Sequence, residues 1–237
     1  MTVAHALEDP LLAYAAEDLA KNPSLVGILS LRDVHKNDSV ARDAYRASEE
    51  AAERGSAFAM CICSRFARAG FGTAQSNEGA FKWAQRAAET GFIPGHYELG
   101  KCYEEGVGVS TDMDHARRQY ELAAEGGFGF SACHLATMYH SGKFGDAARS
   151  KALQYAERAY ELKEPLAPIT LAIWYEHGDG VIRNEKEALK WYLRAVDLGN
   201  FAASFRLSVA YSHGELGLQK DPEMARKYEG MSSSQLS

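Results

Sequence analysis

Cysteines, histidines and glycine-rich loops are the features of this chain that could do chemistry, and their spacing favours structural roles. Cys61 and Cys63 stand two residues apart in a helical pattern, so their thiols point in different directions. Neither a C-x-x-C nor an H-E-x-x-H motif occurs in the chain. Cys63 takes a position that leucine fills elsewhere, which favours a packing role. We therefore predict no metal site and no cofactor.

The histidines and the glycine loops have structural interpretations as well. His140, His177 and His213 stand near the ends of predicted helices and could form a ladder along one edge, but the helix dipole alone favours histidine there. The G-V-G run at 106–108 lacks the third glycine and the preceding strand of a phosphate-binding loop. No G-x-S-x-G motif occurs, and no nucleophile has a predictable base beside it. The sequence predicts a protein that is not an enzyme.

Composition and charge exclude two classes of partner. Of the 237 residues, 46% are hydrophobic and 24% are charged, which is ordinary for a folded protein. The net charge of −6 argues against nucleic acid, because phosphate binding needs a basic face. No apolar run approaches the roughly 20 residues that span a bilayer, and Glu8 and Asp9 interrupt the N-terminal apolar stretch. Four cysteines are few for a disulfide scaffold, so we expect a cytoplasmic protein. From the charge and the lack of a long apolar run, we expect it to bind neither nucleic acid nor membrane.

A repeat of about 36 residues must position these side chains. One phase of the repeat carries alanine, at Ala44, Ala80, Ala116, Ala152 and Ala188. Another phase carries glycine, at Gly70, Gly106, Gly142, Gly178 and Gly214. Glycine accepts the left-handed conformation that ends a helix, so each period contains a first helix that stops at such a glycine. A further glycine closes most second helices, and Lys163 replaces it once.

Both helices of each period show apolar positions three and four residues apart, which indicates one buried stripe per helix. One helix pair cannot bury its apolar surface alone, whereas stacked pairs share a continuous core. The sequence therefore predicts an all-α fold, an α/α superhelix (solenoid) of about six antiparallel helix-pair repeats.

The segments 95–127 and 188–221 resemble Sel1-like repeats, which are relatives of the tetratricopeptide repeat. The matching residues in the first segment are Leu99-Gly100, Tyr103, Gly106-Val107-Gly108-Val109 and Asp112. The resemblance covers about residues 56–230. It implies repeats at about 20–55, 56–91, 92–127, 128–163, 164–199 and 200–230. A capping helix would lie within 1–22, and 231–237 would be a disordered tail.

Two departures from the family pattern stand in the middle of the chain. The residues S-G-K-F-G-D-A-A-R-S at 141–150 replace the usual Gly-x-Gly-Val loop. Lys163 then replaces a closing glycine, and Pro165 follows, where it fits a first helical turn. We expect irregular geometry or specialised binding in these repeats.

The resemblance to tetratricopeptide arrays implies that the first helix of each repeat lines a concave surface. The residues predicted to face a partner there are Arg65, Arg68, Tyr97, Lys101, Phe130, Thr137, His140, Ile169, Ile173, Phe205 and Val209. The last four are apolar where a regular fold does not need apolar groups, which is typical of an interface. Arg65, Arg68 and Lys101 would meet acidic groups. Alternatively, these residues fill a tight superhelical turn or form a homodimer.

The predicted function is a scaffold or adaptor that holds a partner protein or peptide in this groove. Small stand-alone members of the family resemble bacterial effector adaptors or immunity proteins, which is a narrower form of the same hypothesis. Two alternatives stay open. A few relatives have been proposed to act on cell-wall-type substrates, which would make the protein a hydrolase, and a homo-oligomeric structural module would need no partner.

Overall fold

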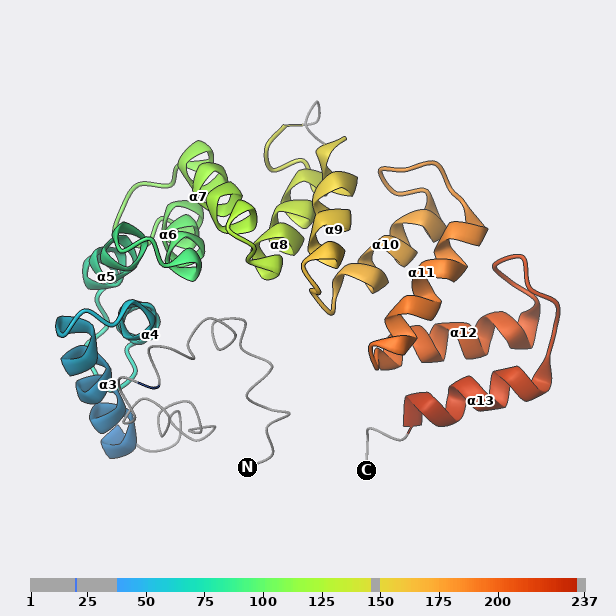
Figure 1. The fold of residues 1–237 in the computed structure, drawn as a ribbon, viewed down its shortest axis with the longest axis horizontal. Coiled ribbons are helices and arrows are strands. Elements are labelled where there is room, and N and C mark those ends of the chain that lie inside the picture. The colour runs from blue at the N-terminus through green and yellow to red at the C-terminus, as the bar shows by residue number, and fades with distance from the viewer. Residues whose placement is uncertain (1–19, 21–37, 146–149, 234–237) are drawn as a thin grey trace. The chain divides into compact units, whose positions relative to one another are not determined.

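The computed structural model describes residues 20, 38–145 and 150–233, and the regular elements within these ranges are helices (Figure 1). They are α3 (Asp38–Glu53), α4 (Ala57–Ala69), α5 (Asn77–Glu89), α6 (Ile93–Glu105), α7 (Met113–Glu125), α8 (Gly129–His140), α9 (Lys151–Glu161), α10 (Ala167–His177), α11 (Glu185–Asp197), α12 (Phe201–His213) and α13 (Pro222–Ser233). The predicted all-α solenoid fold is confirmed.

Two expectations fall at the ends of the chain. The capping helix predicted within 1–22 lies outside the described residues, apart from Ala20. The predicted tail begins at 231, but α13 continues to Ser233, and 234–237 lie outside the described residues. The chain forms two compact units, Met1–Ser131 and Ala132–Ser237, and each is described by itself.

Helix ends follow the local chemistry of the sequence. The first helices begin at polar caps in two repeats, where the side chains of Ser56 and Asn200 accept hydrogen bonds from backbone N–H groups. Four first helices end at glycines in the left-handed conformation, namely Gly70, Gly106, Gly178 and Gly214. The predicted role of these glycines is confirmed. Lys163 also has a positive φ of 65°, so it adopts the glycine conformation at the place where it replaces glycine.

In the N-terminal unit, neighbouring helices from α3 to α7 pack in chain order (Figure 1). Small residues allow α5 and α6 to approach closely. A methyl group on Gly95 of α6 would lie 2.6 Å from the backbone carbonyl carbon of Ala87 on α5. Similarly, Gly100 leaves room for the ring of Tyr120, which would lie 2.7 Å from an added methyl group. The two glycines are therefore packing positions as well as repeat markers.

In the C-terminal unit, α10 packs on α11, α11 on α12 and α12 on α13 (Figure 1). Its core contains the leucines predicted from the repeat, and Leu135, Leu171 and Leu207 are fully buried. Trp191 of α11 packs edge-on against Tyr160 of α9, with ring centroids 5.0 Å apart. The core therefore occupies the sides of the helices that face the neighbouring helices, and it leaves the other side of α10 and α12 open.

Candidate partner-binding surface

An apolar surface lies on the open sides of α10 and α12, and we call it the α10–α12 face. Its residues are Leu166, Ile169 and Ile173 at α10, and Phe201, Phe205 and Val209 on α12. Four of them expose large fractions of their area to solvent, with Leu166 at 51%, Ile173 at 42%, Phe201 at 61% and Phe205 at 61%. Spacings of three and four residues place these side chains in one stripe per helix. Apolar stripes that stay exposed on neighbouring helices are typical of an interaction surface.

A mostly buried ion pair joins the two helices beside this face. Arg206 of α12 donates a hydrogen bond from Nε to Oε1 of Glu176 on α10, at 2.9 Å, and a second one from Nη2. The hydroxyl of Tyr192 on α11 also donates to Glu176. Burial opposes ionisation of Glu176, but the bonds from Arg206 and Tyr192 outweigh it, so the pKa of this carboxyl lies below its ordinary value. Glu176 is therefore ionised at neutral pH.

A polar pocket of about 560 Å³ opens next to this ion pair. Its charged and titratable lining residues are Glu176, His177, Arg183, Glu185, Arg206 and Glu215. Arg206 Nη1 lies 2.7 Å from Glu215, and Arg183 donates to Glu185 at 2.7 Å. Both guanidinium groups are thus already paired within the pocket wall.

The α8 residues of the predicted groove are engaged within the C-terminal unit to different degrees. Thr137 is exposed, and its hydroxyl donates to the carbonyl of His134 at 2.8 Å. The ring of His140 stacks on Trp174 with centroids 4.5 Å apart, and its Nε2 lies 3.1 Å from Asp179. The histidine therefore connects α8 to α10 and to the loop that follows α10.

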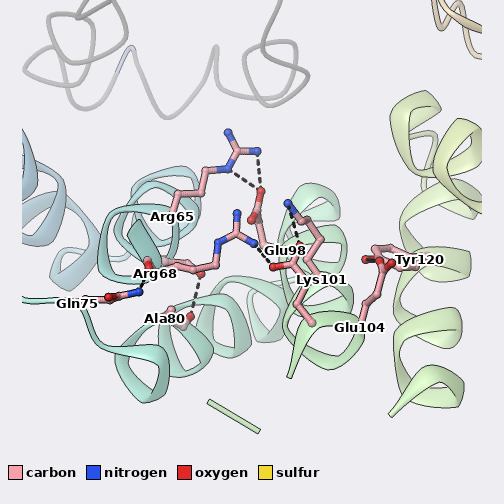
Figure 2. A network of polar contacts seen from close by, with 10 residues as sticks. Arg65, Arg68, Gln75, Ala80, Glu98, Lys101, Glu104 and Tyr120 are labelled. Atoms are coloured by element: carbon pink, nitrogen blue, oxygen red, sulfur yellow. Dashed lines mark hydrogen bonds and ion pairs between the residues drawn. The ribbon is translucent and has the colours of Figure 1, made fainter. Parts of the chain in front are cut away.

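The basic residues predicted to meet acidic partner groups pair with carboxylates of their own chain (Figure 2). Arg65 Nη2 lies 2.6 Å from Glu98. Arg68 donates to Glu105 at 2.9 Å, and Lys101 Nζ lies 3.6 Å from the same carboxylate. A partner's acidic group would therefore have to compete with Glu98 and Glu105. Contact with a partner at these three cations stays a prediction.

Burial separates two further predicted residues from the surface. Tyr97 is only 5% exposed, and its ring contacts those of Tyr120, Phe128 and Phe130 at centroid distances of 5.4, 5.5 and 5.3 Å. Phe130 is half-buried in the same cluster. Tyr97 therefore packs between repeats and is not part of the exposed surface.

Several residues of the site were missed by sequence reasoning. Leu166 lies 36 residues after Phe130 and so shares its repeat position, but it was not among the predicted residues. Phe201 stands at the start of α12, outside the repeat positions used for the prediction, one helical turn before Phe205. Glu215 lies in the loop after α12, and only the structure brings it to Arg206. Two signals in the sequence could have found the first two residues: the 36-residue step from Phe130 to Leu166 and the four-residue spacing of Phe201 and Phe205.

Among the described residues, no group of three or more histidine, cysteine, aspartate or glutamate side chains is arranged to hold a metal ion. None of the helices described is both long and apolar enough to cross a membrane.

Comparison with known proteins identifies the repeat. The family model described as the Sel1 repeat matches residues 57–92, 93–128, 130–164, 170–200 and 202–228. No curated protein matches the chain.

Three solved structures share the fold. A Sel1 repeat protein from Oxalobacter formigenes superposes with a TM-score of 0.73 at 22% identity, over 99% of this chain and 91% of that chain. The protective antigen c5321 of uropathogenic Escherichia coli gives 0.71 at 25% identity, over 94% of this chain and 47% of that chain. Immunity protein Pa5087 from Pseudomonas aeruginosa gives 0.58 at 20% identity, over 93% and 81%.

Proposed function

Because the chain belongs to the Sel1 repeat family, we propose that it is a protein-binding scaffold that holds a partner protein or peptide against the first helices of its C-terminal repeats. Proteins of this family are generally interaction scaffolds. The α10–α12 face is the single observation that carries the proposal, since its apolar side chains stay in contact with water in the isolated chain.

The energetics of the face support binding. Covering a fully exposed phenylalanine or isoleucine side chain contributes roughly 1.5–3 kcal/mol, and partly exposed ones contribute less. Phe201 and Phe205 are the most exposed aromatic residues of the face, and aromatic side chains are enriched among residues that dominate binding energy. Phe205 and Ile173 would thus act as anchors in the middle of the interface, with Leu166 and Phe201 at its edge.

A narrower role within this proposal is that of an adaptor or immunity protein whose partner is a secreted effector. The likeness in fold to immunity protein Pa5087 from Pseudomonas aeruginosa supports it. Two proteins that share a fold need not share a binding partner, so the narrower role depends on identification of the bound protein.

The test is capture by matched variants of the full chain. Immobilised wild-type protein, the Ile173→Asp, Phe205→Asp double variant and a Leu193→Asp control would each be incubated with lysate of the source organism. Leu193 is an exposed leucine in the same unit, but it stands on the second helix α11. We expect quantitative mass spectrometry to find a protein that wild type and control retain and the double variant loses. Equal capture by all three proteins would exclude this face.

Folding and self-association are monitored alongside the capture. Circular dichroism should show the same helicity for the three proteins, because the substituted side chains are exposed. Light scattering of the wild-type protein reports its mass in solution. A dimer that the double variant breaks would instead assign the face to a second copy of this chain.

A further inference from the structure

The apolar stripe of α10 leads into the polar pocket. Leu166, Ile169 and Ile173 follow one another at spacings of three and four residues, and Glu176 comes three residues after Ile173. Glu176 lines the pocket. At 1.5 Å per residue, Leu166 to Ile173 spans about 10 Å and Leu166 to Glu176 about 15 Å. A ligand that follows the stripe therefore reaches the pocket within three turns of helix.

The pocket has an excess of carboxylate over guanidinium. Glu176, Glu185 and Glu215 line it together with Arg183 and Arg206. Arg206 lies between Glu176 and Glu215: its Nε and Nη2 atoms donate to Glu176, and its Nη1 atom is buried from solvent, 2.7 Å from a Glu215 oxygen, in an ion pair without hydrogen-bond geometry. The charge of this guanidinium group is therefore already balanced within the pocket wall. Arg183 already donates to Glu185.

The carboxylates, in contrast, keep acceptor capacity. Each ionised carboxylate has about four lone-pair sites, and Glu185 and Glu215 each receive one of these ion pairs while remaining more than two-fifths exposed. A positively charged guest can therefore form charge-assisted hydrogen bonds in the pocket. An anionic guest would meet three carboxylates and no unpaired guanidinium group.

Resting on the function proposed above, we propose that the partner segment is an amphipathic helix with a basic side chain at one end. Its apolar residues, spaced as i, i+3 or i+4 and i+7, lie on the α10–α12 face, as is usual for a helix held in a hydrophobic groove. A lysine or arginine ten or eleven residues from the first apolar anchor enters the pocket and binds Glu185 and Glu215. The pocket thereby fixes the register and the direction of the helix.

The probe for the test is a displayed library of random peptides long enough for four helical turns, selected against the full chain. Parallel selections use the Ile173→Asp, Phe205→Asp double variant and a Glu185→Gln, Glu215→Gln double variant. The glutamine variants keep the shape of the pocket wall and leave the bond between Arg206 and Glu176 in place. We expect wild type to enrich apolar peptides with the stated spacing and a terminal lysine or arginine.

A synthetic peptide of the enriched sequence is then used in a double-mutant cycle that pairs its basic residue with Glu185 and Glu215. We expect its affinity to fall about tenfold when its basic residue becomes glutamine, and by a similar factor on the Glu185→Gln, Glu215→Gln protein. Combining both changes should cause little further loss, because both remove the same contact.

The outcomes separate this inference from the proposed function. Enriched peptides without a basic residue, with an acidic one, or with unchanged affinity for the glutamine variant would overturn the inference and leave the α10–α12 face as a binding surface. No enrichment by wild type over the Ile173→Asp, Phe205→Asp variant would overturn both. If the wild-type protein is a dimer that binds no peptide, the α10–α12 face is the contact with a second copy of this chain, and the inference of a partner helix is overturned.

Discussion

Arg206 on α12 donates two hydrogen bonds to Glu176 on α10 and thereby joins neighbouring repeats through a pair that is mostly buried. Arg206 is 24% exposed and Glu176 is 11% exposed. A carboxylate in this position needs its partner, because an unpaired charge of low exposure loses hydration without compensation.

The first prediction concerns the loss of this pair. Arg206→Ala should lower the free energy of unfolding by about 2 kcal/mol, since it leaves Glu176 with only the Tyr192 hydroxyl as a donor. Arg183→Ala removes an exposed pair with Glu185 and should change stability by less than about 1 kcal/mol. Urea unfolding of both variants measures the difference. Equal effects would show that burial of the Arg206 pair adds no stability.

The second prediction is a pH dependence with a defined sign. The folded-state pKa of Glu176 lies below its ordinary value of 4.5, so its stabilising effect is present above that pH and is lost as pH falls through the folded value. Glu176→Gln should therefore be less stable than wild type at neutral pH, and the gap should narrow below about pH 4.5. Urea midpoints of both proteins between about pH 3 and pH 7 test it. A gap of constant size over this range would contradict the assigned ionisation.

The third prediction compares one substitution at two helical glycines. Gly95→Ala should destabilise the protein by about 1–3 kcal/mol, because the added methyl group meets the backbone of Ala87 at 2.6 Å. Gly230→Ala in α13 meets no atom within 4 Å and should stabilise it by up to about 1 kcal/mol through helix propensity. Thermal melts should therefore shift in opposite directions. An unchanged or raised melting temperature for Gly95→Ala would show that α6 can move away from α5 at little cost, and a lowered one for Gly230→Ala would contradict the helix-propensity argument.

The fourth prediction concerns thiol reactivity. All four cysteines are free, and burial raises the pKa of Cys63, Cys102 and Cys133 to about 12. Since the thiolate is the reactive form, a disulfide reagent at mildly alkaline pH should label none of them quickly in the folded protein. All four should react after unfolding in urea, which serves as the control. Rapid labelling of one thiol per molecule of native protein would indicate local opening of a first helix.

The helix ends and the buried positions could be predicted from the repeat, because both depend on residues that are close together in the sequence. Gly106 and Gly178 end their helices as expected, because a glycine meets the left-handed requirement wherever it stands. Leu171 and Leu207 are buried as expected, because an apolar stripe at helical spacing has one favourable side. These features depend on local sequence and could be predicted without the tertiary structure.

The candidate site depended on neighbours that are remote in the sequence. Tyr97 and Phe205 occupy the same position of the repeat, yet Tyr97 is 5% exposed and Phe205 is 61% exposed. Rings from α7 and from the start of α8 surround Tyr97. Phe205, in contrast, is open to solvent, although a periodic pattern assigns the two residues the same environment. Periodicity therefore predicted the candidates but could not separate packing residues from exposed ones.

By itself, the sequence determined an array of helix pairs with glycine-terminated first helices and a small-residue core. The reason is that local conformation and helical periodicity depend on residues close together in the sequence. The tertiary structure alone decided that Arg65 pairs with Glu98, that Arg206 pairs with Glu176, and that α10 and α12 keep an apolar face open. Ion pairs and solvent exposure depend on which side chains of neighbouring repeats come into contact. The paired residues are some 30 positions apart in the sequence, and the repeat pattern alone does not specify these contacts.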